Sequence, residues 1–238
     1  MDRNVLVLSG LIGAGKSWYL NELRKDPKFQ DASVLGKDLI KVHHFGAKRE
    51  LVDSEHVFVN ELLRNELKTK LIVDGVNNIL VELVMLTRKN HQEPFVETVR
   101  DAERYIQAIE REKALLARQS LPIPSRVNLR VVLLYCGDLS ELRRRIEARR
   151  QGFGGSNGTD VASLQECIAV AERFEIPDDS KTYFPMVIDT SEDNDQARET
   201  ALGEIRSFFL GRDPRSRTHG FDKFKLEQCI RKMEELPH

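Results

Sequence analysis

The residues with the clearest chemical potential form one run near the amino terminus, Gly10-Leu11-Ile12-Gly13-Ala14-Gly15-Lys16-Ser17. This run fits the spacing G-x-x-x-x-G-K-[ST] of a phosphate-binding loop. Its glycines allow a tight turn in which consecutive backbone N–H groups point into one concavity, at the positive end of the helix that follows. Lys16 would reach the β- and γ-phosphates of a nucleotide, and the Ser17 hydroxyl would bind the Mg²⁺ that bridges them.

The sequence on either side of this run matches the context that such a loop requires. Apolar residues 5–8 predict a strand buried on both faces of a parallel sheet, and residues 18–25 predict a helix. A chance glycine turn between a strand and a helix is the alternative. The N-K-x-D run typical of guanine recognition is absent. The sequence therefore predicts binding of ATP, in preference to GTP, together with magnesium.

A second group of candidate residues follows the next predicted strand, residues 32–36. Lys37, Asp38 and Lys41 come directly after this strand. Ligands of open parallel sheets bind outside the carboxyl ends of the strands, so we expect these side chains to face the phosphates and the acceptor of a transferred group. Asp38 would orient and deprotonate an attacking hydroxyl, and an ordinary helix cap is its alternative role.

The predicted third strand, residues 70–75, ends in Asp74 and Gly75. An aspartate at the tip of an apolar strand is placed to hold Mg²⁺ through water, or to contact the acceptor. Asn77 could contact the acceptor as well, or could be a turn residue before a helix predicted over residues 78–89. A mechanical ATPase would carry a water-activating glutamate at position 75, so the glycine there does not favour hydrolysis.

Cations for a transferred phosphoryl group are predicted after the strongest strand, residues 128–136. Residues 141–150 contain five arginines and two glutamates. Arg145 and Arg149 are four residues apart and share a helical face, and Arg150 follows them. The glycine-rich residues 151–158 predict a mobile flap that could bring these cations onto a phosphate. A solvent-exposed basic helix beside a loop is the alternative.

The composition is that of an ordinary globular chain. Its 238 residues are 40% apolar and 32% charged, as expected for one α/β domain rather than a disordered or membrane protein. The net charge of -1 excludes a global basic field, so any contact with nucleic acid must be local. Three separated cysteines favour neither disulfides nor a zinc site. Without a recognisable leader or membrane span, we expect a cytoplasmic protein with no membrane partner.

The expected domain organisation is one domain over residues 1–210, followed by a linker and a helix over residues 211–238. Within the domain, Pro94 would begin a helical insertion at about residues 94–124, and residues 150–162 would form a lid. The insertion and the C-terminal helix are the candidates for contact with another subunit.

The order of these elements resembles the small P-loop kinases, which include nucleoside monophosphate kinases, polynucleotide kinases and zeta-toxin-like kinases. The run Arg145-Ile146-Glu147-Ala148-Arg149-Arg150 matches the R-I-x-x-R-R pattern before the lid of the first group, and Asp74-Gly75 resembles a strand end of that group. This similarity implies that Arg145 lies against the adenine and that Arg149 binds the phosphates. Asp38 departs from the threonine-glycine signature of that group. It is more similar to the hydroxyl-activating aspartate of the other two groups, as is the D-x-x-N pattern of residues 74–77.

The resemblance implies a three-layer α/β P-loop fold with a five-stranded parallel sheet in the order 2-3-1-4-5. It also implies an ATP- and Mg²⁺-dependent kinase that transfers the γ-phosphoryl group to a hydroxyl or phosphate of a nucleotide, nucleoside or nucleic acid. Lys16, Asp38, Arg145 and Arg149 would act in catalysis. Two alternatives stay open: a kinase of a small non-nucleotide metabolite, and a nucleotide-dependent switch or adaptor with little catalysis.

Overall fold

The computed structural model describes residues 2–46, 51–83, 89–150, 186–211 and 231. Its strands are β1 (Arg3–Gly10), β2 (Ser33–Gly36), β3 (Asn78–Leu83), β4 (Val127–Tyr135) and β5 (Met186–Asp189). Its helices are α1 (Lys16–Lys25), α2 (Lys37–Phe45), α3 (Asp53–Ile72), α4 (Lys89–Leu116), α5 (Leu139–Arg150) and α7 (Asp195–Phe209), with a short 3-10 helix at Pro27–Phe29.

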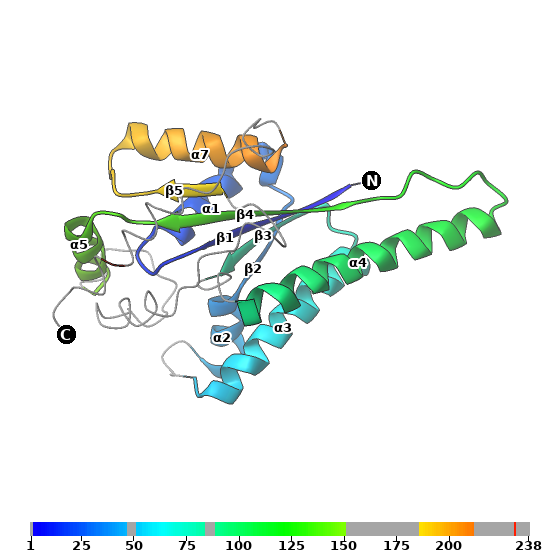
Figure 1. The fold of residues 1–238 in the computed structure, drawn as a ribbon, viewed down its shortest axis with the longest axis horizontal. Helices are drawn as coiled ribbons and strands as arrows, with labels where there is room; N and C mark the ends of the chain where they lie inside the picture. Colours follow the sequence, from blue (N-terminus) through cyan, green and yellow to red (C-terminus); the bar gives the residue numbers. More distant parts are fainter. Residues whose placement is uncertain (1, 47–50, 84–88, 151–185, 212–230, 232–238) are drawn as a thin grey trace.

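The strands form one sheet in the order β2-β3-β1-β4-β5, and every pairing within it is parallel. Helices cover both faces of the sheet (Figure 1). Because β1 lies in the middle and is covered on both sides, its residues 5–8 read as an uninterrupted apolar run. The predicted three-layer fold and the predicted strand order are confirmed.

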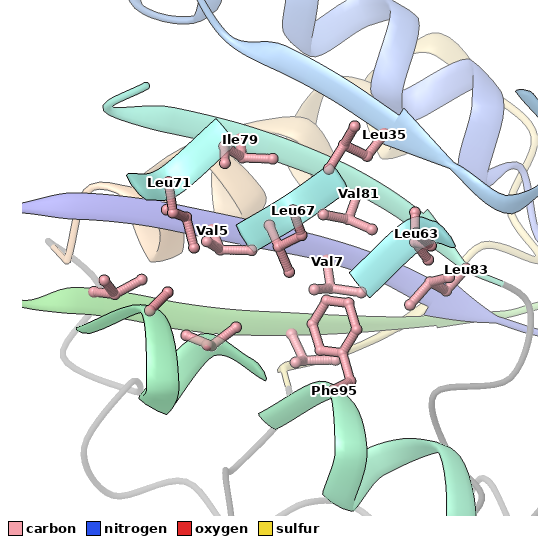
Figure 2. Close-up of a cluster of buried hydrophobic side chains, with 14 of the residues drawn as sticks. Val5, Val7, Leu35, Leu63, Leu67, Leu71, Ile79, Val81, Leu83 and Phe95 are labelled. Carbon is pink, nitrogen blue, oxygen red and sulfur yellow. The ribbon is translucent and has the colours of Figure 1, made fainter. Parts of the chain in front are cut away.

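Each face of the sheet has its own hydrophobic core, because successive side chains of a strand point to opposite faces. Val5 and Val7 of β1 pack against α3 and the first half of α4, where Phe95 closes the cluster (Figure 2). Leu6 and Leu8 point the other way and pack against α1 and α7. The two cores fix β1 from both sides and with it the start of the loop that follows.

The predicted third strand is wrong. Residues 70–72 are the last turn of α3, and Asp74 lies in the turn that follows. The strand is β3, which occupies Asn78–Leu83, where the sequence analysis predicts a helix. Leu71 is fully buried because it continues the helical stripe of Leu67 four residues earlier. A short apolar run of this kind cannot be assigned to a helix or a strand from periodicity alone.

Pro94 does not separate two helices, because α4 runs through it. Proline there, at the sixth residue of the helix, removes one backbone hydrogen bond to the preceding turn. The Thr98 hydroxyl donates to the Pro94 carbonyl at 2.7 Å. The first half of α4 packs on the sheet, and its second half projects beyond the amino ends of the strands (Figure 1).

Two of the predicted features fall outside the described residues. These are the flap at 151–158, with all but the first residue of the predicted lid, and the C-terminal helix apart from residue 231. Within the described part of the chain, no helix combines the length and the apolar character that a membrane crossing demands.

Candidate functional site

The predicted phosphate-binding loop joins β1 to α1 at the carboxyl edge of the sheet. Gly15 is the N-cap of α1 and has a φ of 82°, in the left-handed region that glycine adopts without strain. The amino end of α1 therefore opens toward the loop, as an anion site requires. The strand, loop and helix arrangement expected from the sequence is confirmed.

Gly10 has a packing reason of its own at the start of this loop. It pairs with Leu134 of β4, and its φ is 145°. A Cβ at this position would lie 1.9 Å from the Leu134 carbonyl oxygen. Glycine is thus needed for β1 and β4 to approach each other where the loop begins.

Lys16 folds back into the loop. Its side chain is 6% exposed, and its Nζ donates to the carbonyls of Gly10 at 3.1 Å and Leu11 at 2.8 Å. A buried ammonium group requires such acceptors, because burial without them would be very costly. The positive charge is thereby held within the loop where a phosphate would bind.

Ser17 contacts a carboxylate that the sequence analysis missed. The Ser17 hydroxyl donates to Oε1 of Glu82 at 2.7 Å. Glu82 lies near the end of β3, in register with Leu8 of β1 and Gly36 of β2. A hydroxyl and a carboxylate beside a phosphate-binding loop are the hard oxygen donors that Mg²⁺ prefers. The residues present therefore fit a magnesium ion at this position.

The structure places Asp74 and Asn77 at the opposite, amino edge of the sheet. Asp74 accepts a hydrogen bond from Lys70 Nζ at 2.9 Å. The Asn77 carbonyl accepts from the backbone N–H of Asn4, at the start of β1, at 2.7 Å. The predictions that Asp74 holds magnesium and that Asn77 contacts the acceptor are therefore wrong. The D-x-x-N pattern of residues 74–77 lies away from the loop, so its resemblance to the polynucleotide and zeta-toxin-like kinases does not identify site residues here. The signal for Glu82 was an acidic residue after the apolar run of residues 79–81.

Asp38 lies at the same edge as Glu82. Gly36, which pairs with Glu82, is the N-cap of α2 and makes no side-chain cap hydrogen bond, and Asp38 sits in the first turn. Its carboxylate is exposed. The alternative role of Asp38 as the N-cap is thus not observed, although a negative charge in the first turn still favours the helix. Lys37 precedes Asp38, and Lys41 follows one turn later.

Arg145 connects α5 to the loop. Its Nε donates to Glu141 at 2.6 Å, and its Nη1 donates to the Gly13 carbonyl at 3.3 Å and to the Thr190 hydroxyl at 3.1 Å. Its Nη2 donates to the Thr190 carbonyl. The bond to Gly13 places α5 beside the phosphate-binding loop. The guanidinium group, however, is engaged by protein acceptors and its side chain is only 16% exposed, so it holds the loop in place.

Thr190, just after β5, is a second residue that the sequence analysis did not assign to the site. Its buried hydroxyl lies 3.2 Å from the Ala14 carbonyl and 2.9 Å from the Tyr135 carbonyl, to which it can donate. In a trans peptide the C=O and the following N–H point in opposite directions. Anchoring the Ala14 carbonyl on the outside of the loop therefore turns the Gly15 N–H toward its inside.

Glu141 supplies the charge that fixes Arg145. Hydrogen bonds from Arg144 and from Arg145 lower the pKa of Glu141 from its ordinary value of 4.5 to about 2, against the opposing effect of burial. Glu141 is thus ionised throughout the neutral range. Arg149 and Arg150 end α5 one turn beyond Arg145, and their side chains lie outside the described part of the structure.

Neither a protein-family model nor a curated protein sequence matches the chain. Several solved structures are similar to it. A candidate kinase from Chloroflexus aurantiacus has a TM-score of 0.53 and 16% identity, and the match covers 87% of this chain and 98% of that one. Kti12 from Chaetomium thermophilum, in complex with ADP-AlF3, has a TM-score of 0.52 and 12% identity over 86% of this chain and 98% of its own. The protein APE1195 has a TM-score of 0.54 and 14% identity over 88% of this chain and 96% of its own.

At such low identity these similarities concern the fold. They extend over most of the chain, and they agree with the loop, the parallel sheet and the strand order described above. The protein thus has the same three-layer α/β fold, with a phosphate-binding loop after the first strand, as these structures.

Proposed function

We propose that the protein is an ATP- and Mg²⁺-dependent kinase that transfers the γ-phosphoryl group to a hydroxyl or phosphate of a nucleotide, nucleoside or nucleic acid. The observation that carries the proposal is the 2.7 Å hydrogen bond between Glu82 and Ser17, the residue that follows Lys16. It brings a hydroxyl, a carboxylate and an ammonium group together at the carboxyl edge of two neighbouring strands. The same types of group bind triphosphate and magnesium in P-loop enzymes. The bound ADP-AlF3 in Kti12, a protein of the same fold, supports a nucleotide as the donor.

The donor side of the reaction rests on residues 10–17. Backbone N–H groups of this loop and the ammonium group of Lys16 would bind the phosphates. Ser17 and Glu82 would hold the magnesium ion, which when bound neutralises charge on the phosphate oxygens. Arg145 keeps the loop in position, while Arg149 and Arg150, one turn later, would add positive charge near the transferred group.

The acceptor side rests on the start of α2. Asp38 would accept the proton of the attacking hydroxyl and orient its oxygen toward the γ-phosphate. Lys37 and Lys41 lie on either side of Asp38 along the helix and would bind anionic groups of the acceptor. Exclusion of water around these groups would favour transfer to the acceptor over hydrolysis.

The decisive experiment follows the label from γ-labelled ATP. The protein is incubated with Mg²⁺ and a panel of nucleosides, nucleoside monophosphates, DNA and RNA ends, sugars and other small hydroxyl compounds. We expect label on a nucleotide-containing acceptor and little ATP consumption without one. Label on a non-nucleotide compound would identify a metabolite kinase, and no label with slow turnover would favour a switch or adaptor.

Asp38→Asn tests the assignment of the base. The substitution keeps the size of the side chain and removes the carboxylate, so we expect kcat to fall by about 10²- to 10⁴-fold with little change in the Kd for ATP. Asp31→Asn, at an exposed carboxylate just before β2, is the matched control and is expected to behave like the native protein. Equal turnover of the Asp38 variant and the control would refute the assignment.

A further inference from the structure

The second half of α4 and the segment that returns from it to β4 form a narrow arm, residues 107–126. Side chains of α4 hold the two parts together. Gln107 Nε2 donates to the Ser125 carbonyl at 2.9 Å, and Glu110 accepts from the Ser125 backbone N–H at 3.1 Å and from its hydroxyl at 2.5 Å. Figure 1 shows the arm extending past the amino ends of the strands, away from the edge with the phosphate-binding loop. The arm is therefore a braced projection, clear of the proposed active site.

The end of this arm, residues 111–123, is called the arm tip and is rich in exposed apolar side chains. Leu116 lies ten residues beyond Ile106, the last α4 residue in the core cluster, which is about 15 Å at ~1.5 Å per residue. Four aliphatic side chains of the tip are largely exposed: Leu115 (67%), Leu116 (79%), Leu121 (63%) and Ile123 (94%). Two of them are neighbours on the helix, about 100° apart, and two come from the return segment. The apolar side chains thus surround the tip and do not form one flat face.

The arm tip also has an excess of positive charge. Arg111, Lys113 and Arg118 stand against one acid, Glu112, and all four are exposed, so three positive charges minus one give a balance of +2. Among the described residues, Arg118 is the one non-glycine residue with a positive φ, 51°, in the turn that ends α4. Glycine is favoured at such a position. The chain therefore keeps a cation at the tip against the preference of the backbone.

We propose that the arm tip inserts into the surface of an anionic membrane, with its aliphatic side chains among the lipid tails and its cations at the headgroup phosphates. The proposal goes beyond the kinase function and does not depend on it. Exposed apolar clusters mark interaction sites, and apolar insertion combined with attraction to anionic lipids holds a protein at a bilayer surface. The expectation of no membrane partner rests on the lack of a recognisable span, and a peripheral contact needs no span.

Two other partners of an apolar tip fit these observations less well. A second copy of the chain, paired tip to tip, would bring a surface with the same +2 charge, and like charges in contact are unfavourable. The groove of another protein would cover one side of the tip and leave the apolar side chains on the other side in water. A bilayer surrounds an inserted tip on every side. The charge therefore favours an acidic surface, and the distribution of the apolar side chains favours a lipid one.

The test measures sedimentation of the full chain with vesicles, without nucleotide. Vesicles of phosphatidylcholine containing phosphatidylserine are compared with pure phosphatidylcholine vesicles, at low and at high salt. We expect binding to the phosphatidylserine vesicles alone and release at high salt. The double variant Leu116→Ser, Ile123→Ser should bind at least about 10-fold more weakly, because it removes two aliphatic side chains from the lipid. Val57→Ser, at a 58% exposed valine on α3, is the control without effect.

Charge variants and a reporter at the arm tip test the two parts of the contact. Lys113→Gln should weaken binding about 5-fold, and Glu112→Gln should strengthen it by a similar factor, since each changes the charge by one. Ile123→Trp should be quenched by lipids with brominated tails more strongly than the native protein, whose single tryptophan is Trp18. Unchanged affinity of both charge variants refutes the role of the cations. No additional quenching refutes insertion.

The remaining outcomes decide between the membrane and the other partners. No binding of the native protein to phosphatidylserine vesicles overturns the proposal, and so does equal binding by the native protein and the double variant. A native dimer that the double variant dissociates, seen by sedimentation velocity without lipid, assigns the tip to a second copy. Tip-dependent binding of an amphipathic helical peptide of glutamate and leucine, without vesicle binding, assigns it to an acidic protein. Thermal melting and label transfer from ATP should be unchanged in all variants, because the replaced side chains are exposed and lie away from the active site.

Discussion

Replacing Thr190 with valine should weaken nucleotide binding, although Thr190 need not touch the nucleotide. The substitution removes a hydroxyl and keeps the β-branched shape. That hydroxyl lies 3.2 Å from the Ala14 carbonyl, 2.9 Å from the Tyr135 carbonyl and 3.1 Å from Arg145 Nη1, in a residue that is 4% exposed. One hydroxyl has one hydrogen to donate, so its bond is shared between the two carbonyls.

The size of the stability loss in Thr190→Val depends on which partners of the hydroxyl keep other hydrogen bonds. The Tyr135 carbonyl also accepts from the backbone N–H of Thr190 at 2.8 Å. Arg145 retains Gly13 and Glu141 as acceptors. The Ala14 carbonyl depends most on the hydroxyl, and an unpaired buried carbonyl costs about 1–3 kcal/mol. We expect the free energy of unfolding to fall by that amount. If the Gly15 N–H then turns away from a phosphate, the Kd for ATP rises about 5- to 30-fold, equivalent to about 1–2 kcal/mol.

The assay is a nucleotide titration by calorimetry, combined with urea unfolding of the same variants. Thr190→Ser keeps the hydroxyl and loses only a methyl group, so it should bind ATP like the native protein. An unchanged Kd for Thr190→Val, together with the expected loss of stability, would show that the loop keeps its geometry without this anchor. The role of the Thr190 hydroxyl in orienting the Gly15 N–H would then be refuted.

Two further predictions concern carboxylates around the loop. Glu82→Gln keeps an oxygen that can accept from Ser17 but removes the charge, so the Mg²⁺ concentration needed for tight ATP binding should rise at least about 10-fold. A magnesium titration measures this, with Glu112→Gln, on the exposed part of α4, as the control. Identical titration curves for the two variants would contradict the prediction. Because the pKa of Glu141 is lowered in the folded state to about 2 from 4.5, its contribution to stability is complete above about pH 4.5 and is lost as the pH falls toward 2. Glu141→Gln should reduce the acid dependence of the unfolding free energy within this window, and an unchanged slope would count against it.

The parts of the fold that local sequence determines were predictable. The loop of residues 10–17 is recognisable because its glycines, Lys16 and Ser17 are contiguous and the flanking strand and helix have distinct patterns. The strand order came from the resemblance and is confirmed. The prediction of the third strand failed because Leu71 and its apolar neighbours form the buried last turn of a helix. A short buried helical segment and a short buried strand have the same apolar composition.

The site was less predictable because its contacts join distant residues. Ser17 and Glu82 are 65 residues apart in sequence, and Thr190 and Ala14 are 176 apart. The predicted strand order 2-3-1 places the carboxyl end of the third strand beside the loop that follows the first. Glu82 was therefore missed only because the third strand was predicted at the wrong residues. The role of Thr190 could not be predicted from the sequence, because a sequence pattern does not show which loop carbonyl needs a hydrogen-bond donor.

Contacts at the amino edge of the sheet help to set the strand register on which the site at the carboxyl edge depends. At the amino edge, the amide of Asn4 donates to Asn78 at 3.1 Å and accepts from Asn128 at 3.1 Å, which links β3, β1 and β4 in register. Four residues further along the same ladder, Leu8 of β1 pairs with Glu82 of β3. A slip of one residue would turn the Glu82 side chain to the opposite face of the sheet, away from Ser17. The asparagine contacts at one edge therefore help to determine which carboxylate meets the phosphate-binding loop at the other.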